Sequence, residues 1–344
     1  MTRPVRLSDV AAAAKTSTKT ASRVINGDPR VSADTRARVQ RAVVELGYRV
    51  DLLARSLRRG VDDAVGVLVP SIGDPFFASA LHEIEQLGRA RGIQVIIAST
   101  PRDPVLERRA VETLLARRVA GLIITPFFTD YRFLAQAATP VVFFDRAPVG
   151  VAAETVLVDD KAGAQLVVRH LASFGHRRIA LIGDSVEVPT SNARRAGYLQ
   201  ALHELGLAVD PLLDRSDCVD AARAYQQTKA LLELPNPPTA IFSGRAETSL
   251  GVARALHRHN RTDIAMASFD DFALAEILEP AISVTDHDPR ALARFAMERL
   301  LARLDGAPFA PGEHLLPLQV IARGSGELRP LKVLPGAASL GVGA

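Results

Sequence analysis

The sequence contains a single cysteine, Cys218, among its 344 residues. One cysteine excludes an intramolecular disulfide framework and a cysteine-rich metal site, and it is typical of a protein in a reducing cytoplasm. No apolar run reaches the length of a membrane span, and charged residues stand near the N-terminus where a secretory signal would be apolar. We therefore expect a cytoplasmic protein with no membrane partner.

The motifs of the common enzyme classes are also missing. The sequence has no phosphate-binding loop ending in Gly-Lys-Ser/Thr, no nucleophile elbow, no dinucleotide-binding glycine fingerprint and no zinc-ligand spacing. Gly324-Ser325-Gly326 precedes no expected helix, and His257 and His259 have no acidic or cysteine partner nearby. An enzyme is the first alternative class of function, and these absences argue against it. We expect no catalytic residue, no metal and no cofactor.

Positive charge is concentrated at the N-terminal end. Residues 1–60 carry 13 Lys and Arg against 5 Asp and Glu, whereas the other 284 residues carry 29 against 33. The net charge of +4 therefore combines a segment of +8 with a body of −4. Because phosphate contacts supply most of the affinity of nucleic-acid binding, this asymmetry predicts a nucleic-acid partner. The alternative is a solvated basic helical bundle that binds nothing.

Residues 7–27 show the pattern of two short helices joined by a tight turn. The first is expected over 7–14, and the second begins at Ser17 and ends near Asn26-Gly27. Only Lys15 and Thr16 lie between them, so the helices must cross at a steep angle. Matching apolar faces are formed by Val10, Ala11, Ala14, Ala21 and Val24, which leaves Thr18, Lys19, Ser22 and Arg23 pointing outward. This is the pattern of a helix-turn-helix that enters a DNA major groove.

A third helix is expected from the cap Ser32 to about Leu46, where Gly47 ends it. Val39, Val43 and Leu46 lie at helical spacing and would close a three-helix core. The linker that follows could form one or two further helical turns capped by Asp51. That segment is too short to be stable alone and would order only when packed against something.

From residue 63 onward, short apolar runs alternate with helical stretches. The expected strands are AVGVLV (64–69), IQVIIA (93–98), AGLII (120–124), PVVFF (140–144), IALI (179–182), TAIF (239–242) and IAMAS (264–268), and the expected helices include 75–91, 104–118, 161–174 and 192–205. Continuous apolar strands that alternate with helices indicate parallel sheets covered on both faces, and the series is too long for one sheet. We predict an all-α helix-turn-helix head and an α/β body of two doubly wound parallel-sheet subdomains with a cleft between them.

The expected domain organisation rests on these patterns and on the family resemblance that is described next. It comprises a DNA-binding domain over 1–50, a hinge and linker over 51–62, a ligand-binding and dimerisation body over 63–330, and a loose tail over 331–344. Within the body, one subdomain is expected over about 63–160 plus 290–320, and the other over 161–289 plus 321–330.

Together these parts resemble the LacI/GalR family of bacterial transcription regulators. The resemblance rests on Ser17–Gly27, Val31-Ser32, Leu46-Gly47-Tyr48, Leu53–Leu57, Asp74-Pro75-Phe76-Phe77, Asp145-Arg146, Arg194–Tyr198, Phe269-Asp270-Asp271 and Arg323-Gly324-Ser325, in this order and spacing. It implies a body of periplasmic-binding-protein type and a sequence-specific DNA-binding regulator, most often a repressor of carbohydrate-metabolism genes. A secreted solute-binding protein shares such a body but would carry a signal peptide instead of residues 1–60.

The resemblance also implies how the head reads DNA. Thr18 and Lys19 match the main base-reading positions, with Arg23 one turn later; Lys and Arg suit guanine O6 and N7, and Thr suits a polar edge or a thymine methyl. Leu57 matches the hinge leucine that wedges into the minor groove at the operator centre. The full predicted DNA-binding set is Leu7, Ser17, Thr18, Lys19, Thr20, Ser22, Arg23, Asn26, Arg30, Tyr48, Ala54, Arg55 and Leu57.

The head departs from the family pattern at the turn and at the hinge. Lys15 stands where glycine is usual, which would cost roughly 1 kcal/mol if the backbone there is left-handed. The hinge begins Val50-Asp51 instead of Pro-Asn. Asp51 is a competent cap, but it adds negative charge near phosphates.

The resemblance places a small-molecule effector in the cleft between the subdomains. The matching positions are Phe76, Phe77, Asp145, Arg146, Arg194, Arg245, Asp270 and His287. Carboxylates and guanidinium groups that converge on one cleft beside an aromatic ring suit a polyhydroxylated ligand, because each charged group can form two hydrogen bonds with adjacent hydroxyls. The expected effector is a sugar or a sugar derivative.

Two departures bear on the charge of that effector. Arg245-Ala246 replaces the family's usual Asn-Asp, and His287 replaces a common glutamine. One hypothesis is that Arg245 makes the cleft suitable for an anionic effector. The alternative is that Arg245 pairs with Asp270 or Asp286 and contacts no ligand.

The expected assembly is a two-fold homodimer that presents two heads to a pseudopalindromic double-stranded operator. The hinge would fold only on DNA, and effector binding would change the angle between subdomains and so the spacing of the two hinges. Because the tail has no leucine heptad, assembly should stop at the dimer. Relief of repression and co-repression use this machinery with opposite sign, and the sequence is compatible with both.

Overall fold

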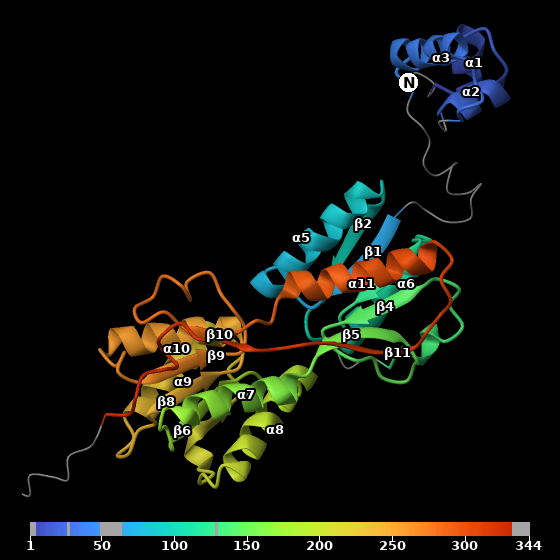
Figure 1. Cartoon of the computed structure of the whole chain (residues 1–344). Helices are drawn as coiled ribbons and strands as arrows, with labels where there is room; N and C mark the ends of the chain where they lie inside the picture. Colours follow the sequence, from blue (N-terminus) through green and yellow to red (C-terminus); the bar gives the residue numbers. More distant parts are fainter. Residues whose placement is uncertain (1–4, 26–27, 49–63, 128–129, 332–344) are drawn as a thin grey trace, which may run out of the picture. The chain divides into compact units, whose positions relative to one another are not determined.

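A computed structural model describes residues 5–25, 28–48, 64–127 and 130–331. The chain divides into two compact units, Met1–Asp62 and Asp63–Ala344, which are taken here one at a time. The first unit contains the helices α1, α2 and α3, and the second contains two sheets with their covering helices (Figure 1).

The head is a three-helix cluster of α1 (Leu7–Ala13), α2 (Thr18–Ile25) and α3 (Ala33–Glu45). The Ser17 hydroxyl accepts the Thr20 amide at 3.1 Å, and the Ser32 hydroxyl accepts the Thr35 amide at 3.4 Å, so both residues cap a helix as predicted. The helix-turn-helix is thereby confirmed. Its buried core is Val10, Ala11, Ala14, Ala21, Val24, Val39 and Ala42.

Two details of the head concern predictions made from the sequence. Lys15 has φ of +52°, so the turn that usually holds glycine is left-handed here and carries the predicted strain. The expectation that Leu46 closes the core is wrong, because Leu46 is 37% exposed. Leu46 caps the C-terminus of α3 after the helix has ended, and Ala42, one turn earlier, holds the core position instead.

The first lobe of the body is built on a parallel sheet in the order β11-β5-β4-β3-β1-β2. Helices α5 and α11 pack side by side on one face, and α6 and the short η1 lie on the other. The bounds are β1 (Ala64–Val69), α5 (Pro75–Ala90), β2 (Gln94–Ser99), α6 (Pro104–Ala116), β3 (Gly121–Ile124), η1 (Tyr131–Leu134), β4 (Val141–Phe144), β5 (Glu154–Val158), α11 (Pro289–Leu304) and β11 (Gly312–Leu316).

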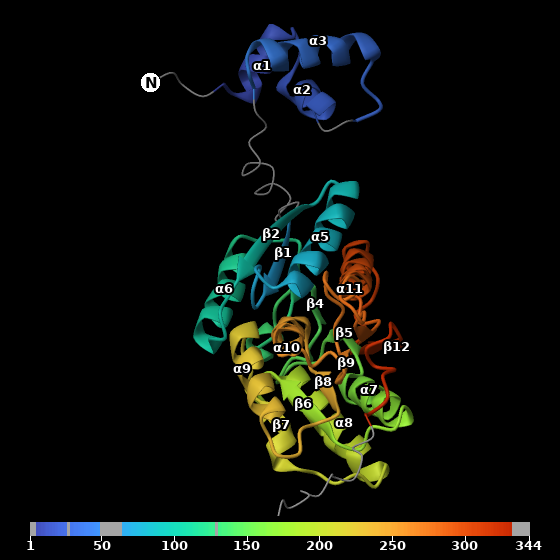
Figure 2. The same ribbon diagram turned by 90° about the vertical axis from the view of Figure 1, so that its left-hand side faces the viewer.

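The second lobe repeats this plan with the order β12-β10-β9-β8-β6-β7, in which all described pairs are parallel except β10 with β12. Helices α7 and α8 cover one face, and α9 and α10 the other (Figure 2). The bounds are α7 (Asp160–Ser173), β6 (Ile179–Gly183), α8 (Pro189–Glu204), η2 (Pro211–Leu213), β7 (Asp214–Ser216), α9 (Ala221–Leu232), β8 (Ala240–Ser243), α10 (Ala246–Arg258), β9 (Ala265–Ser268), β10 (Ser283–Thr285) and β12 (Val320–Ile321).

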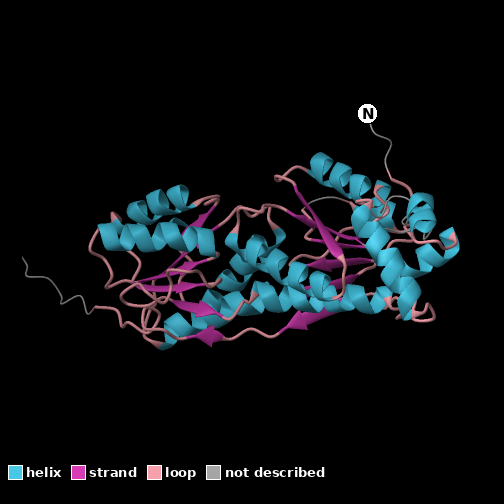
Figure 3. Cartoon of the chain, turned by 90° about the horizontal axis from the view of Figure 1, so that it is seen from above, coloured by secondary structure: helices cyan, strands magenta, loops and turns pink. Residues whose placement is uncertain are grey.

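The chain passes between the lobes at three places: after β5, after β10 and after β11 (Figure 3). The predicted fold class, two doubly wound parallel sheets, is confirmed. Strands such as β1 and β3 are buried at every position and are therefore continuously apolar, which is why the sequence pattern predicts them.

Candidate functional site

The candidate ligand site is a cavity between the carboxyl ends of the strands of both lobes. Its lining comes from the segments that follow β1, β4, β6, β8 and β9 together with residues of α8 and the β10–α11 connection. The central cavity measures about 50 Å³, and a recess of about 440 Å³ adjoins it. All of the predicted effector-binding residues line it: Phe76, Phe77, Asp145, Arg146, Arg194, Arg245, Asp270 and His287.

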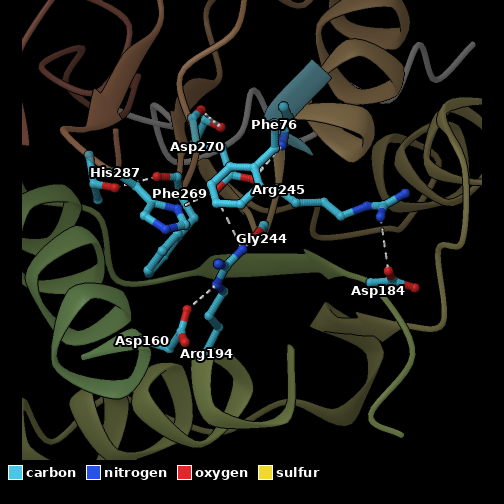
Figure 4. A network of polar contacts seen from close by, with 12 residues as sticks. Phe76, Asp160, Asp184, Arg194, Gly244, Arg245, Phe269, Asp270 and His287 are labelled. Carbon is cyan, nitrogen blue, oxygen red and sulfur yellow. Dashed lines mark hydrogen bonds and ion pairs between the residues drawn. The ribbon is translucent and has the colours of Figure 1, made fainter. Parts of the chain in front are cut away.

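A buried chain of charged groups forms the floor of the cavity (Figure 4). Arg194 Nε donates to Asp160 Oδ1 at 2.7 Å, and Nη1 donates to the Gly244 carbonyl at 2.6 Å and lies 3.5 Å from Asp270 Oδ1. His287 Nδ1 is 2.9 Å from the same Asp270 oxygen. Arg194 is thus held rigidly between two carboxylates, and it presents a fixed guanidinium to the cavity.

Burial and charge act in opposite directions on the acids of this chain. Burial raises the pKa of Asp160 in spite of the neighbouring Arg194. Burial also acts to raise the pKa of Asp270, but Arg194 and the hydrogen bond from His287 outweigh it and lower that pKa to about 2. Asp270 is therefore ionised at neutral pH, and it can accept hydrogen bonds.

Aromatic rings give the cavity its apolar wall. The Phe76 ring lies 4.8 Å from the His287 ring, and Phe269 lies 5.5 Å from His287 on a perpendicular plane. The guanidinium of Arg194 stacks at 3.8 Å over Phe269. His287 Nε2 is buried and has no hydrogen-bond partner among the described residues, so it is free to bond a ligand.

Arg146 is a second buried guanidinium of the cavity, and unlike Arg194 it has donors without partners among the described residues. Its Nε lies 3.2 Å from Asp145 Oδ2, and its side chain is 9% exposed. Burial lowers the pKa of Arg146. Within the described part of the chain, Nε and Nη1 make no hydrogen bond. Buried donors without acceptors are costly, and a bound ligand with hydroxyl or carbonyl oxygens would satisfy them.

Arg245 has partners other than those considered from the sequence. Its Nη1 lies 3.2 Å from Asp184 Oδ2 and 4.0 Å from Asp74 Oδ2, and Nη2 donates to the Val219 carbonyl at 3.0 Å. The proposed pairing with Asp270 or Asp286 is therefore wrong: Asp270 is engaged by Arg194 and His287, and Asp286 accepts the Gln319 amide.

Several residues of this site are not among those predicted from the sequence. Asp184 directly follows β6, Asp160 is the first residue of α7, and Arg102 lies in the loop after β2. A signal was available, because polar residues just beyond the carboxyl end of a buried parallel strand face the cleft. The missed set is Asp74, Arg102, Asp160, Asp184, Thr190 and Ser191.

The candidate DNA-binding residues of the head divide by exposure. Ser17, Thr18, Lys19, Arg23 and Arg30 are exposed, whereas Leu7, Thr20, Ser22 and Tyr48 are half-buried. Leu7 and Tyr48 pack against the head core, so they also have a structural role. Asn26, Ala54, Arg55 and Leu57 lie outside the described residues, as do Val50 and Asp51.

Asp28 partly neutralises this basic surface. It accepts two hydrogen bonds from Arg30 at 2.9 Å and lies 3.8 Å from Arg23 Nε. The hydrogen bonds from Arg30 lower the pKa of Asp28 to about 2. Arg23 and Arg30 are thereby pre-positioned on one side of α2, while Lys19 at the start of that helix makes no ion pair with a described residue.

Among the described residues, no helix combines the length and apolar character that crossing a membrane requires.

Comparison with known proteins agrees with this arrangement. Residues 6–51 match the family of bacterial regulatory proteins of the lacI family, and residues 168–326 match a periplasmic binding protein-like domain. The chain is 30% identical to the HTH-type transcriptional repressor CytR of Escherichia coli (strain K12) over 334 residues, 94% of this chain and 97% of CytR. It is 32% identical to the sucrose operon repressor of Klebsiella pneumoniae over 325 residues, 92% and 97% of the two chains.

The fold has a close counterpart among solved structures. The crystal structure of the lac repressor dimer bound to operator and the anti-inducer ONPF superimposes with a TM-score of 0.85 and 28% identity, covering 94% of this chain and 99% of that one. A helix-turn-helix head followed by a two-lobed body with an internal ligand cavity defines a DNA-binding transcriptional regulator. The chain belongs to the lacI family of bacterial regulatory proteins.

Proposed function

We propose that this regulator represses carbohydrate-metabolism genes and that a sugar or sugar derivative, bound between its two lobes, controls its affinity for a pseudopalindromic operator. The observation that carries the proposal is the convergence of Arg146, Arg194, Asp270 and His287 with an aromatic wall in one buried cavity. Relatives named for sucrose and ribose operons support the carbohydrate class. On this proposal the protein is not an enzyme.

The head supplies the DNA contacts. Thr18 and Lys19 stand exposed at the start of α2 and would reach base edges in the major groove, while Arg23 follows one turn later. The DNA backbone near these bases would be contacted by the other predicted residues of the described head: Leu7, Ser17, Thr20, Ser22, Arg30 and Tyr48. The assignments of Asn26, Ala54, Arg55 and Leu57 stay predictions, because these residues lie outside the described part.

The assembly we propose is a homodimer in the cytoplasm. Two symmetric heads match two operator half-sites, and the solved relative in the operator complex is a dimer. The division of labour is the one expected from the sequence: residues 1–50 bind DNA, 51–62 connect, and 63–330 bind the effector and dimerise. An effector acts only through its different affinity for the two arrangements of the lobes.

Selective capture of genomic fragments by the full-length protein at physiological salt, followed by sequencing, tests the DNA part. We expect enrichment of a short inverted repeat with a pyrimidine–purine step at its centre. Enrichment in the presence of one ligand only would identify a co-repressor. A uniform background with and without sugars would contradict sequence-specific binding.

Titration of a sugar panel against the captured operator tests the cleft. The active sugar should lose about tenfold or more in apparent affinity in an Arg194→Lys variant, because Lys lacks the planar fork that Asp160 and the ligand share. Arg195→Lys is the matched control: the adjacent Arg195 pairs with Asp214 at 2.6 Å outside the cavity. An equal response in both variants would exclude the proposed site.

A further inference from the structure

The two lobes meet at a carboxylate held between two arginines. Asp184 directly follows β6 in the second lobe, and its oxygens accept hydrogen bonds from Nη1 and Nη2 of Arg102, which lies after β2 in the first lobe. Arg245 Nη1 also lies 3.2 Å from Asp184 Oδ2 (Figure 4). The Asp184 side chain is 5% exposed and that of Arg102 is 37% exposed, so a buried carboxylate of one lobe pairs with a partly exposed guanidinium of the other.

The position of Asp184 is set by its backbone as well as by its ion pairs. Its Oδ1 accepts the Ser185 amide at 2.7 Å, and its carbonyl accepts the Ser191 hydroxyl at 3.0 Å and the Asp217 amide at 3.3 Å. The Ser185 amide restrains the carboxylate itself, and the two bonds to the carbonyl fix the backbone from which that side chain extends. Asp184 is thus a built part of the cleft and not a surface side chain that happens to lie nearby.

Asp184 determines the local balance of charge beside Arg102 and Arg245. Arg194 lies between Asp160 and Asp270, and Arg146 lies beside Asp145. Arg102 and Arg245 share Asp184, and the next carboxylate, Asp74, is 4.0 Å from Arg245. Without the Asp184 carboxylate, the recess lined by Arg102, Arg146 and Arg245 would carry an excess of positive charge.

We propose that Asp184 is an internal counter-ion that occupies the anion position of the cleft and thereby restricts the effector to uncharged molecules. The inference rests on the ligand-binding role proposed for the cleft, and it names the chemical class of that ligand. An anionic group beside Arg245 would have to approach the buried Asp184 carboxylate, where like charges repel more strongly than they do in bulk water. A neutral polyhydroxyl compound instead uses the free donors of Arg146 and the free nitrogen of His287.

The sharpest test converts the cleft into an anion site. Inorganic sulfate is titrated calorimetrically into the full-length protein at constant ionic strength. Wild type should bind sulfate weakly or not at all, whereas Asp184→Asn and Asp184→Ser should bind it about tenfold or more tightly, since two guanidinium groups lose their shared carboxylate. Adding Arg102→Gln to Asp184→Asn should remove the gain.

Asp214→Asn is the matched control. Asp214 is a largely buried aspartate of the same lobe that pairs with Arg195, and it lies outside the cavity, so its loss should create no sulfate site in the cleft. Thermal unfolding of each variant verifies that it is folded. Folded Asp184 variants without a gain would overturn the proposal, as would wild-type binding of sulfate that Arg245→Gln abolishes.

This outcome is separate from that of the proposed function. Sulfate binding requires neither an operator nor a sugar. A protein that captures no operator would contradict the regulator assignment and leave the sulfate result intact. Conversely, a neutral sugar that releases the operator, together with Asp184 variants that ignore sulfate, would keep the function and remove the role of Asp184.

Discussion

His287 Nδ1 lies 2.9 Å from Oδ1 of Asp270, and the His287 ring lies 4.8 Å from the ring of Phe76. When Nδ1 carries the proton it donates to this carboxylate, and the buried Nε2 then has a lone pair that can accept a hydrogen bond. His287 therefore contacts both the charged floor of the cavity, through Asp270, and its aromatic wall, through Phe76.

The ionisation of Asp270 makes stability depend on pH in acid. Although burial acts to raise the pKa of Asp270, Arg194 and His287 lower it from 3.8 to about 2. Because the folded-state pKa is the lower one, the stabilisation is present above pH 4 and is lost as the pH falls from about 4 to about 2. Urea unfolding at pH values between 4 and 2 should show that the free energy of unfolding falls less in Asp270→Asn than in wild type. A parallel loss in both proteins would contradict this origin.

A buried histidine gives a second pH dependence of stability. In this case the folded state favours the neutral form of the side chain, whereas at Asp270 it favours the charged form. Burial lowers the pKa of His176 below 6.5; its ring lies 3.0 Å from the Thr239 hydroxyl and 2.8 Å from the Leu328 carbonyl. The neutral ring satisfies both partners, with Nε2–H donating to the carbonyl. Because the unfolded chain binds a proton first, stability is full above pH 6.5 and falls below it. In the His176→Asn variant, the unfolding midpoint should depend less on pH between pH 6.5 and 5 than it does in wild type. An unchanged slope of midpoint against pH would refute the assignment.

The left-handed turn of the head offers a stabilising substitution. Lys15 has φ of +52°, and glycine adopts this conformation without the steric cost of Cβ. Lys15→Gly should stabilise the head by about 0.5–1 kcal/mol, measured by hydrogen exchange of its core amides in the full-length protein. Lys15→Ala is the control, since alanine keeps Cβ and removes the same charge. A gain in both variants would assign the effect to charge instead of to the backbone.

A buried glutamate connects two distant parts of the first lobe. Glu154 on β5 is fully buried, and it accepts hydrogen bonds from Arg299 at 2.9 Å and Arg303 at 3.3 Å on α11. Glu154→Gln removes the charge between two guanidinium groups that are partly exposed, so we expect a loss of about 2 kcal/mol in unfolding free energy. Glu85→Gln, in an exposed pair with Arg89, should cost much less unfolding free energy than Glu154→Gln, because solvent screens that pair. Equal costs would mean that the burial of Glu154 has no energetic consequence.

The elements that sequence reasoning predicted well are those with a strong local cause. Caps such as Ser32 and buried apolar strands such as β1 depend on neighbours within a few residues, and they were placed correctly. The strands β5, β7, β10, β11 and β12 are not among those predicted. β7, β11 and β12 are partly exposed and polar, and β5 and β10 are mostly buried but contain polar residues that shorten their apolar runs. The prediction for Leu46 is wrong because it applies helical spacing beyond Glu45, the last residue of α3.

Local sequence patterns predict the helix-turn-helix and the two doubly wound sheets, and with the family resemblance they predict part of the residue set that meets at the carboxyl ends of the strands. These follow from local periodicity and from the geometry common to all parallel sheets. The tertiary structure alone decided the pairing of charges within the cavity, in which Arg245 meets Asp184 and Arg102 reaches across from the other lobe. Which carboxylate neutralises which guanidinium depends on distances between segments that are separated by tens of residues, and no local pattern encodes those distances.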